Sequence, residues 1–255
     1  MGFVFDHPAL FFPLVCALLF AAGWLGVWLR KNRFKTVDAE RDAFKSVETS
    51  VLGLLALLLG FTFAMAVNRY DLRQELEVNE ANAIGTTWLR TATMDDSSRD
   101  TARKLLREYG NTRLAFFTAG ADHSAVDANV AHTGDLQDQL WNLIAQNAKD
   151  HRDPVSGLMM TTLNDTIDLS EKRTAAFENR IPMAAWILLI FIASAGSALV
   201  GLGSVTRERG LLLILPLIVG SALTLTLDLD SPRTGLVHVP QHSMERVVAQ
   251  INASK

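Results

Sequence analysis

The chain has 255 residues, and its 24 Lys and Arg against 27 Asp and Glu give a formal net charge of -3. Charged residues make up 20% of the chain but leave four stretches without any charge: 8–29, 49–68, 181–206 and 210–227. A helix that crosses the ~30 Å hydrocarbon core of a bilayer needs about 20 mostly apolar residues, so each stretch is long enough to span a membrane. This excludes an ordinary soluble enzyme. Because the net charge is near zero and no basic cluster accompanies aromatic residues, we expect no nucleic acid among the partners.

The first apolar stretch has the features of a retained membrane span rather than of a cleaved signal peptide. A signal peptide starts with a basic region and ends at small residues, whereas residues 1–7 contain no Lys or Arg. The stretch ends in Trp24, Trp28 and the basic run 30–33, which is typical of an interfacial aromatic belt followed by basic anchors. Cys16, the only cysteine, lies inside this span and has no partner for an intrachain disulfide.

Residues 69–180 form a polar insert whose apolar residues recur at helical spacing. The first insert helix continues straight out of the second span. Ser97 and Asp100 resemble a capping box that opens the next helix. A third helix runs to about Lys149, Asp153-Pro154 stops it, and a fourth leads directly into the third span. The insert is therefore predicted to be a helical extension of the membrane bundle.

The predicted fold is all-α, with four transmembrane helices and a helical insert between the second and the third. We expect a multi-pass protein of the cell inner membrane, in contact with the lipid bilayer. The chain divides into spans one and two with a basic connecting loop, the extramembrane insert, spans three and four, and a C-terminal tail: 1–68, 69–180, 181–228 and 229–255.

The charges of the short loops bear on the orientation of the protein in the membrane. The loop from Arg30 to Val47 carries six Lys or Arg, and the loop between spans three and four adds Arg207 and Arg209. Short basic loops are usually cytoplasmic, which places the helical insert on the outside.

Sequence motifs of catalytic or metal sites are missing. There is no G-x-S-x-G, H-E-x-x-H, P-loop or C-x-x-C motif. His238 and His242 are four residues apart, but Pro240 between them argues against a helix that presents both to one metal. We therefore expect no enzyme, no catalytic residue, no cofactor and no metal.

Two of the spans carry stripes of residues that are spaced four apart. In the third span, the small residues Ala193, Ser197 and Gly201 are spaced four apart, which predicts a helix-packing face. In the second span, a stripe of the same spacing has two possible roles. A monomer would bury it against its other helices, whereas an oligomer would arrange it around an axis as rings of apolar side chains that exclude water. This second stripe comprises Gly53, Leu57 and Phe61.

The end of the second span resembles the bestrophin family. There, an apolar run ends in Gly-Phe, seven residues follow, and then come Arg and an aromatic residue; here Gly60-Phe61 is followed by seven residues and Arg69-Tyr70. The segment 80–85, Glu-Ala-Asn-Ala-Ile-Gly, is similar to the bacterial bestrophin-like family in particular. The acidic segment 228–235 after the fourth span and the order of the elements also agree. The resemblance covers roughly residues 45–240.

The resemblance implies a homopentameric ion channel that conducts anions, with small inorganic ions as its other partners. Its second helices would line an axial pore with a neck at Gly53, Leu57 and Phe61. Gly53 departs from the family, which has a larger apolar residue there, so that ring would be wider or missing. Asp228 and Asp230 alone are too few for a calcium site, which takes six or more oxygens. The resemblance also implies a cytosolic insert, contrary to the loop charges.

Polar residues after the neck form a candidate pore mouth, Asn68, Arg69 and Arg73. Repeated around an axis, the arginines would make a positive ring that favours anions; as an alternative, they are interfacial anchors that snorkel to the membrane surface. Three acidic residues follow closely and would cancel such a ring, which leaves a cation path open: Glu75, Glu77 and Glu80.

Two functions are compatible with the sequence. The first is a bestrophin-like ion channel, and the alternative is a non-conducting membrane scaffold or sensor whose helical insert binds a protein or a ligand. The direction of the second-span stripe discriminates between them. A stripe that faces an axis between subunits favours the channel, and a stripe packed within one subunit favours the scaffold.

Overall fold

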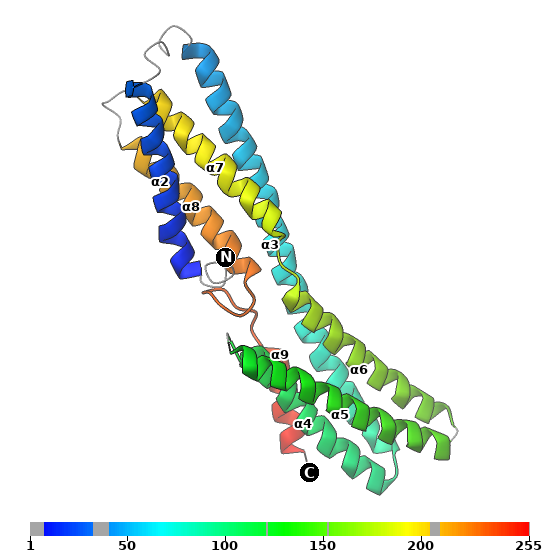
Figure 1. Ribbon diagram of the computed structural model, residues 1–255. Coiled ribbons are helices and arrows are strands. Elements are labelled where there is room, and N and C mark those ends of the chain that lie inside the picture. Colours follow the sequence, from blue (N-terminus) through cyan, green and yellow to red (C-terminus); the bar gives the residue numbers. More distant parts are fainter. Residues whose placement is uncertain (1–7, 33–40, 121, 152, 205–209, 255) are drawn as a thin grey trace. The chain divides into compact units, whose positions relative to one another are not determined.

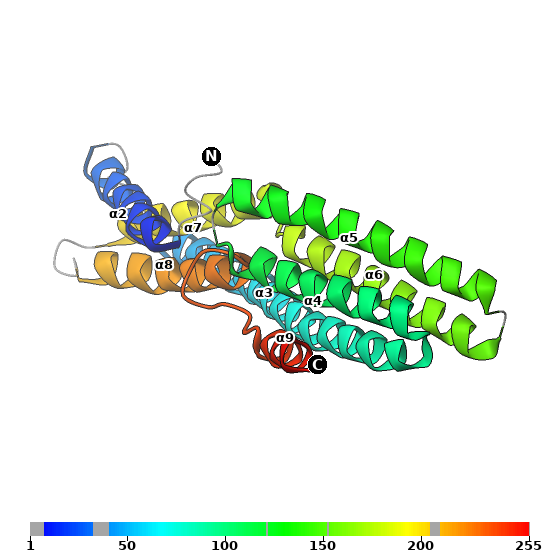
Figure 2. The same ribbon diagram turned by 90° about the horizontal axis from the view of Figure 1, so that it is seen from below.

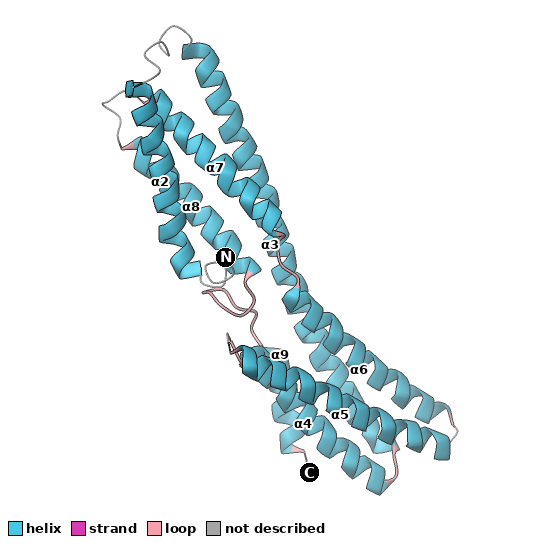
Figure 3. Ribbon diagram, in the orientation of Figure 1, coloured by secondary structure: helices cyan, strands magenta, loops and turns pink. Residues whose placement is uncertain are grey.

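The computed structural model describes residues 8–32, 41–120, 122–151, 153–204 and 210–254. Over these residues it contains helices and no strand, so the predicted all-α class is confirmed (Figure 3). Four of the described helical segments are long and apolar enough to cross a membrane. Residues 33–40 and 205–209, which hold four of the eight Lys and Arg used to argue orientation, lie outside the described part of the chain.

The chain forms two compact units, which we call the membrane unit and the insert unit. The membrane unit comprises residues 1–70 and 180–238, and the insert unit comprises residues 71–179 and 239–255. One long helix, α3 (Arg41–Arg90), contributes its first part to the membrane unit and its second part to the insert unit.

The membrane unit contains the four predicted spans. They are α2 (Pro8–Asn32), the first part of α3, α7 (Met183–Gly203) and α8 (Leu211–Asp230) (Figure 1). Helix α2 packs against α7 and α8. All four helices contribute to one apolar core, which includes Phe11, Val15, Leu19, Leu55, Ala66, Trp186, Leu189, Leu223 and Leu227.

The contact between α2 and α7 depends on glycine. A Cβ atom on Gly201 would overlap the backbone of Gly23, and a Cβ atom on Gly26 would overlap the backbone of α7. The other two residues of the predicted packing face, Ala193 and Ser197, are buried as well. Small residues at these positions let the two backbones touch, which is a common way for membrane helices to associate.

The insert unit is a helical bundle. Its elements are the second part of α3, η1 (Thr91–Thr93), α4 (Asp96–Thr118), α5 (His123–Asp150), α6 (Pro154–Glu178) and α9 (His242–Ala253). Figure 2 shows α4, α5 and α6 running alongside the second part of α3. The main core of this unit draws on all five α-helices, through residues that include Ile84, Trp88, Leu106, Tyr109, Leu140, Leu163, Met244 and Ile251.

The start of α4 differs from the prediction. Its N-cap is Asp95, whose carboxylate accepts a hydrogen bond from the Ser98 backbone N–H at 3.2 Å. The predicted capping box of Ser97 and Asp100 is therefore wrong. The Ser97 hydroxyl instead donates to the Asp95 carboxylate at 2.8 Å, because Asp95 occupies the extended position from which a side chain reaches the free amides of the first turn.

The two ends of α6 can also be compared with the helix boundaries predicted from the sequence. Helix α5 ends at Asp150, just before the predicted stop at Asp153-Pro154. Asp153 caps α6 through the Ser156 amide at 2.8 Å, and Pro154 stands in the first turn of α6. However, α6 does not lead directly into α7, because the helix is interrupted at residues 179–182. Pro182 ends this interruption, and a proline inside a helix would remove a backbone hydrogen bond and clash with the preceding turn. Helix α9, within the expected tail, was not predicted.

Candidate functional site: two faces of α3

One face of the first part of α3 packs into the membrane unit. Leu55 is 3% exposed, Thr62 is 6% exposed and Ala66 is fully buried. Leu55 and Ala66 belong to the apolar core shared with the other three spans. Spacings of seven and four residues keep these positions on one side of a helix with 3.6 residues per turn.

The predicted neck lies on the opposite face of the same helix. Leu57 is 53% exposed and Phe61 is 62% exposed. A Cβ atom added to Gly53 would meet nothing within 4 Å, and the same holds for Gly60 beside the stripe. The stripe is therefore not packed within the described chain, and its possible partners are lipid or another copy.

The structure does not place the three residues of the predicted pore mouth on one face of α3. Asn68 is exposed on the side of the neck. Arg69 turns to the packed side, where its Nη1 lies 3.3 Å from Oδ1 of Asp230 and only 17% of its side chain is exposed.

The position of Arg73 differs from its predicted place at the pore mouth. Its side chain is 1% exposed, and it donates hydrogen bonds from Nε to the Ala176 carbonyl and from Nη2 to the Asn179 carbonyl, both at 3.0 Å. It therefore satisfies carbonyl groups at the end of α6, which have no partner within that helix. Arg73 lies 18 residues after the buried Leu55, about five helical turns, so the register of α3 places it on the packed face.

The two aspartates in the last turn of α8 hold neighbouring backbone segments in place. Asp230 accepts hydrogen bonds from the Ile181 amide at 3.0 and 3.2 Å in addition to its contact with Arg69. Asp228 accepts hydrogen bonds from the amides of Leu236 and Val237 at 2.8 and 2.9 Å. These carboxylates tie the segment that follows α8 to the end of the spans, which gives both residues a structural role.

The acidic residues after the mouth divide between the two faces. Asp71 and Glu75 are exposed, whereas Glu77 is 2% exposed and Glu80 is fully buried. The Glu77 carboxylate accepts a hydrogen bond from the Met244 amide at 2.7 Å, which satisfies a free N–H in the first turn of α9.

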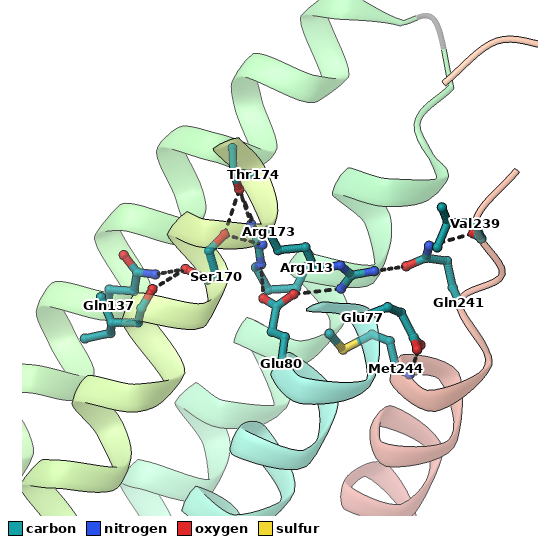
Figure 4. Close-up of polar contacts among 11 residues, drawn as sticks. Glu77, Glu80, Arg113, Gln137, Ser170, Arg173, Thr174, Val239, Gln241 and Met244 are labelled. Carbon is teal, nitrogen blue, oxygen red and sulfur yellow. Dashed lines mark hydrogen bonds and ion pairs between the residues drawn. The ribbon is translucent and has the colours of Figure 1, made fainter. Parts of the chain in front are cut away.

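Glu80 is the centre of a buried polar cluster in the insert unit (Figure 4). Its two carboxylate oxygens bind Arg113 Nε at 2.5 Å and Arg173 Nη1 at 2.7 Å. Arg113 also donates to the Ser170 carbonyl at 3.0 Å, and Arg173 donates to the Gln241 side chain. The cluster thus links α3, α4 and α6 to the segment before α9.

Burial shapes the electrostatics of this cluster. Desolvation lowers the pKa of Arg173, and the charge of Glu80 partly opposes that shift. Desolvation also raises the pKa of Tyr109, and the nearby negative charge of Glu80 adds to this effect. Because an unpaired buried charge is very unfavourable, the cluster is best described as a structural clamp. The sequence places Glu80 close to the predicted pore mouth, and no local signal in it identifies the partners of this carboxylate.

Four apolar spans, a helical insert and an unpacked face on the second span define a helical multi-span membrane protein. The family model of the Bestrophin-like domain matches residues 17–244. The chain therefore belongs to the bestrophin-like family, as the resemblance indicated.

Solved structures agree with this assignment. A crystal structure of a mutated bacterial bestrophin homologue from Klebsiella pneumoniae matches with a TM-score of 0.69 and 13% sequence identity, covering 95% of this chain and 99% of that chain. A second mutated form of that homologue gives a TM-score of 0.70 at 13% identity, covering 95% and 97% of the two chains. At this identity the likeness shows the bestrophin fold. No curated protein shows a significant match.

Proposed function

We propose that the chain is an ion channel of the cell inner membrane, assembled as a homo-oligomer, with five copies by resemblance to the bestrophins. The exposed face of α3 lines the axis between the copies. The observation that carries this proposal is the contrast along one helix. Leu55 and Ala66 are buried in the core of the membrane unit, whereas Leu57 and Phe61 on the opposite side have more than half of their surface exposed.

The neck controls passage through its apolar rings. Around an axis, Leu57 and Phe61 each form a ring that water leaves readily, and an ion that crosses it loses part of its hydration shell. Gly53 contributes no side chain, so the pore widens at its level. Shorter side chains at Leu57 and Phe61 are therefore expected to lower the barrier.

The structure bears on the anion preference that the resemblance suggested. That preference depended on a ring of Arg69 and Arg73, but both side chains are engaged on the packed face. The two arginines are therefore not available on the exposed face to form a positive ring at the mouth, and the proposal of ion conduction does not include an anion preference from them.

Ion flux into liposomes that contain the purified full-length protein tests this function. We compare wild type with Leu57→Ala/Phe61→Ala and with Phe191→Ala/Leu217→Ala, a control that trims the same residue types on α7 and α8, where they are 68% and 50% exposed. Flux that increases in the α3 variant and stays at the wild-type level in the control supports the channel. Absence of flux from all three proteins contradicts it.

A second candidate is the scaffold or sensor, and one observation favours it. The insert unit has an open groove of about 420 Å³ between α3 and α6, with polar groups that include Asn79, Asn82, Asp165, Asp168 and Lys172. Such a groove is suited to a polar ligand or to a partner's side chains. This candidate becomes the preferred function if the liposomes show no ion flux.

A further inference from the structure

We propose that the membrane unit has a binding groove for one phospholipid with a zwitterionic, ammonium-bearing headgroup. The groove lies where α2 begins and α8 ends, and the loop that follows α8 forms its third side. The bound lipid places an acyl chain along the apolar walls and its headgroup at Asp228. This inference requires a membrane protein but no ion conduction, so it goes beyond the proposed function.

The groove has the size and lining of a ligand site. Its volume is about 620 Å³, and its lining residues all belong to the membrane unit. The walls are mostly apolar and include Leu10 and Phe12 of α2 and Leu225 of α8. Pockets for organic ligands typically have about 300–1,000 Å³, with hydrophobic walls and a few placed polar groups.

The position of the groove favours a lipid as its occupant. Helices α2 and α8 pack against each other (Figure 1), and both are long and apolar enough to cross a membrane. Leu10 and Leu225 are 50% and 46% exposed, so the apolar walls are open on the side that meets the bilayer. A groove of this kind at the end of two spans is within reach of acyl chains, whereas a water-soluble ligand would gain little from it.

The loop after α8 is held in place as one side of the groove. Asp228 accepts hydrogen bonds from the amides of Leu236 and Val237 at 2.8 and 2.9 Å, which folds the loop back onto the helix. Gly235 has a φ of +128°, and a Cβ atom on it would overlap Oδ1 of Asp228, so this close approach requires glycine. The Leu236 side chain is left 94% exposed at the groove, where it is available to pack against lipid.

Two polar groups of the lining are available to a headgroup. The Thr234 hydroxyl is buried and has no hydrogen-bond partner in the described chain, although buried polar groups are normally hydrogen-bonded. A phosphate or ester oxygen of the lipid accepts its hydrogen. Each carboxylate oxygen of Asp228 accepts one amide hydrogen bond and has a second acceptor site, to which an ammonium N–H donates.

The charge of the lining selects the kind of headgroup. Among the described residues that line the groove, Asp228 is the only ionisable one. Its negative charge disfavours a fatty-acid carboxylate or a lipid of net negative charge, because charges interact strongly where little water is present. A zwitterionic phospholipid offsets the same charge with its ammonium group.

Native mass spectrometry of the full-length protein tests the groove. The protein is titrated in detergent with phosphatidylethanolamine or with phosphatidylglycerol of the same acyl chains. We expect wild type to bind phosphatidylethanolamine about tenfold more tightly, which corresponds to ~1.4 kcal/mol. In Ala9→Phe the new ring enters the groove at the second residue of α2, and this affinity should fall about tenfold as well. The matched control, Ala184→Phe, adds the same ring at the second residue of α7, where the alanine is also exposed, and should keep the wild-type affinity.

Thr234→Val tests the hydroxyl without adding bulk. Valine has nearly the shape of threonine but no donor, so the loss of one hydrogen bond to the lipid should lower the affinity about two- to tenfold. The melting temperature of the lipid-free variant should not fall, because the hydroxyl has no partner to lose within the described chain. A merely structural role of Thr234 would lower the melting temperature and leave the lipid affinity unchanged.

Four outcomes overturn the proposal. They are equal affinity of wild type for the two lipids, wild-type affinity in both Ala9→Phe and Thr234→Val, an equal loss in Ala184→Phe and Ala9→Phe, and binding that requires deletion of residues 2–7. The last outcome would assign the groove to the chain's own N-terminal segment. The elution profile of each purified variant checks its fold. Because ion flux enters none of these measurements, failure of this inference is distinguishable from failure of the proposed function.

Discussion

The two faces of α3 differ in what surrounds them. On the packed face, Leu55 and Ala66 lie in the core of the membrane unit, and Glu80 holds two buried arginines in the insert unit. On the exposed face, Leu57 and Phe61 make no core contacts, and Asp71 and Glu75 face away from the bundle. The first face therefore explains how one chain folds. The second has apolar and acidic side chains that the fold of a single chain does not use, and such a surface is available for assembly and function.

The largest expected effect comes from the packed face. In Glu80→Gln, Arg113 and Arg173 lose the carboxylate that neutralises them while they remain buried. Removing one partner of a buried ion pair costs about 3–5 kcal/mol, so we expect the insert unit to unfold at a clearly lower temperature. Circular dichroism of the purified protein during heating measures this.

Glu75→Gln is the matched control for that substitution, with the same chemical change on the exposed face of the same helix. Its effect on stability should stay within about 0.5 kcal/mol, as for most surface substitutions. Equal destabilisation by both substitutions would contradict the distinction between the two faces.

Glycine offers the next comparison. Gly201→Ala places a methyl group against the backbone of Gly23, so α2 and α7 must separate; overpacking of this kind costs about 1–3 kcal/mol. Gly60→Ala adds the same methyl group where nothing lies within 4 Å, so it should not destabilise the protein. Unfolding midpoints in detergent compare the two, and a greater loss in Gly60→Ala would show that its surroundings are misassigned.

A smaller effect is expected for α9. In Glu77→Ala the buried Met244 amide loses its acceptor, and an unsatisfied buried group costs about 1–3 kcal/mol. Amide hydrogen exchange should accelerate in residues 242–253 first, because this helix is the one that loses its cap. The control Glu75→Ala should leave their exchange unchanged, and protection retained in Glu77→Ala would argue against this contact.

The smallest effect concerns the exposed start of α4. Hydrogen bonds from the Ser97 hydroxyl and the Ser98 amide lower the pKa of Asp95 to about 2. A lowered pKa in the folded state stabilises it above the unfolded value of about 3.9, and this contribution disappears as the pH falls through about 2. Asp95→Asn should therefore melt slightly below wild type at neutral pH, with a difference that shrinks in acid. A difference that grows in acid would contradict the assigned cap.

The four spans could be predicted from the sequence because uncharged apolar stretches of about 20 residues are typical of membrane helices. The shared helix face of Leu57 and Phe61 could also be predicted, since helical spacing is a local property. Which face the fold would bury was not predicted, because the spacing of Arg73 from Leu55 shows only that the two residues share a helix face. Glu80 could not be assigned, because its partners are 33 and 93 residues away in the chain. Helix α9 was missed even though Met244, Val247, Val248 and Ile251 have helical spacing, because its segment is short.

Cysteine accessibility tests most directly whether the exposed face of α3 lines the pore. Cys16 is the only native cysteine, so Cys16→Ala provides a background without thiols. In it, Phe61→Cys on α3 is compared with Phe191→Cys on α7, where the native side chains are 62% and 68% exposed. A charged, water-soluble thiol reagent should reduce the ionic current of Phe61→Cys and leave that of Phe191→Cys unchanged. An unaffected current in Phe61→Cys, or equal block of both, would contradict a pore lined by this face.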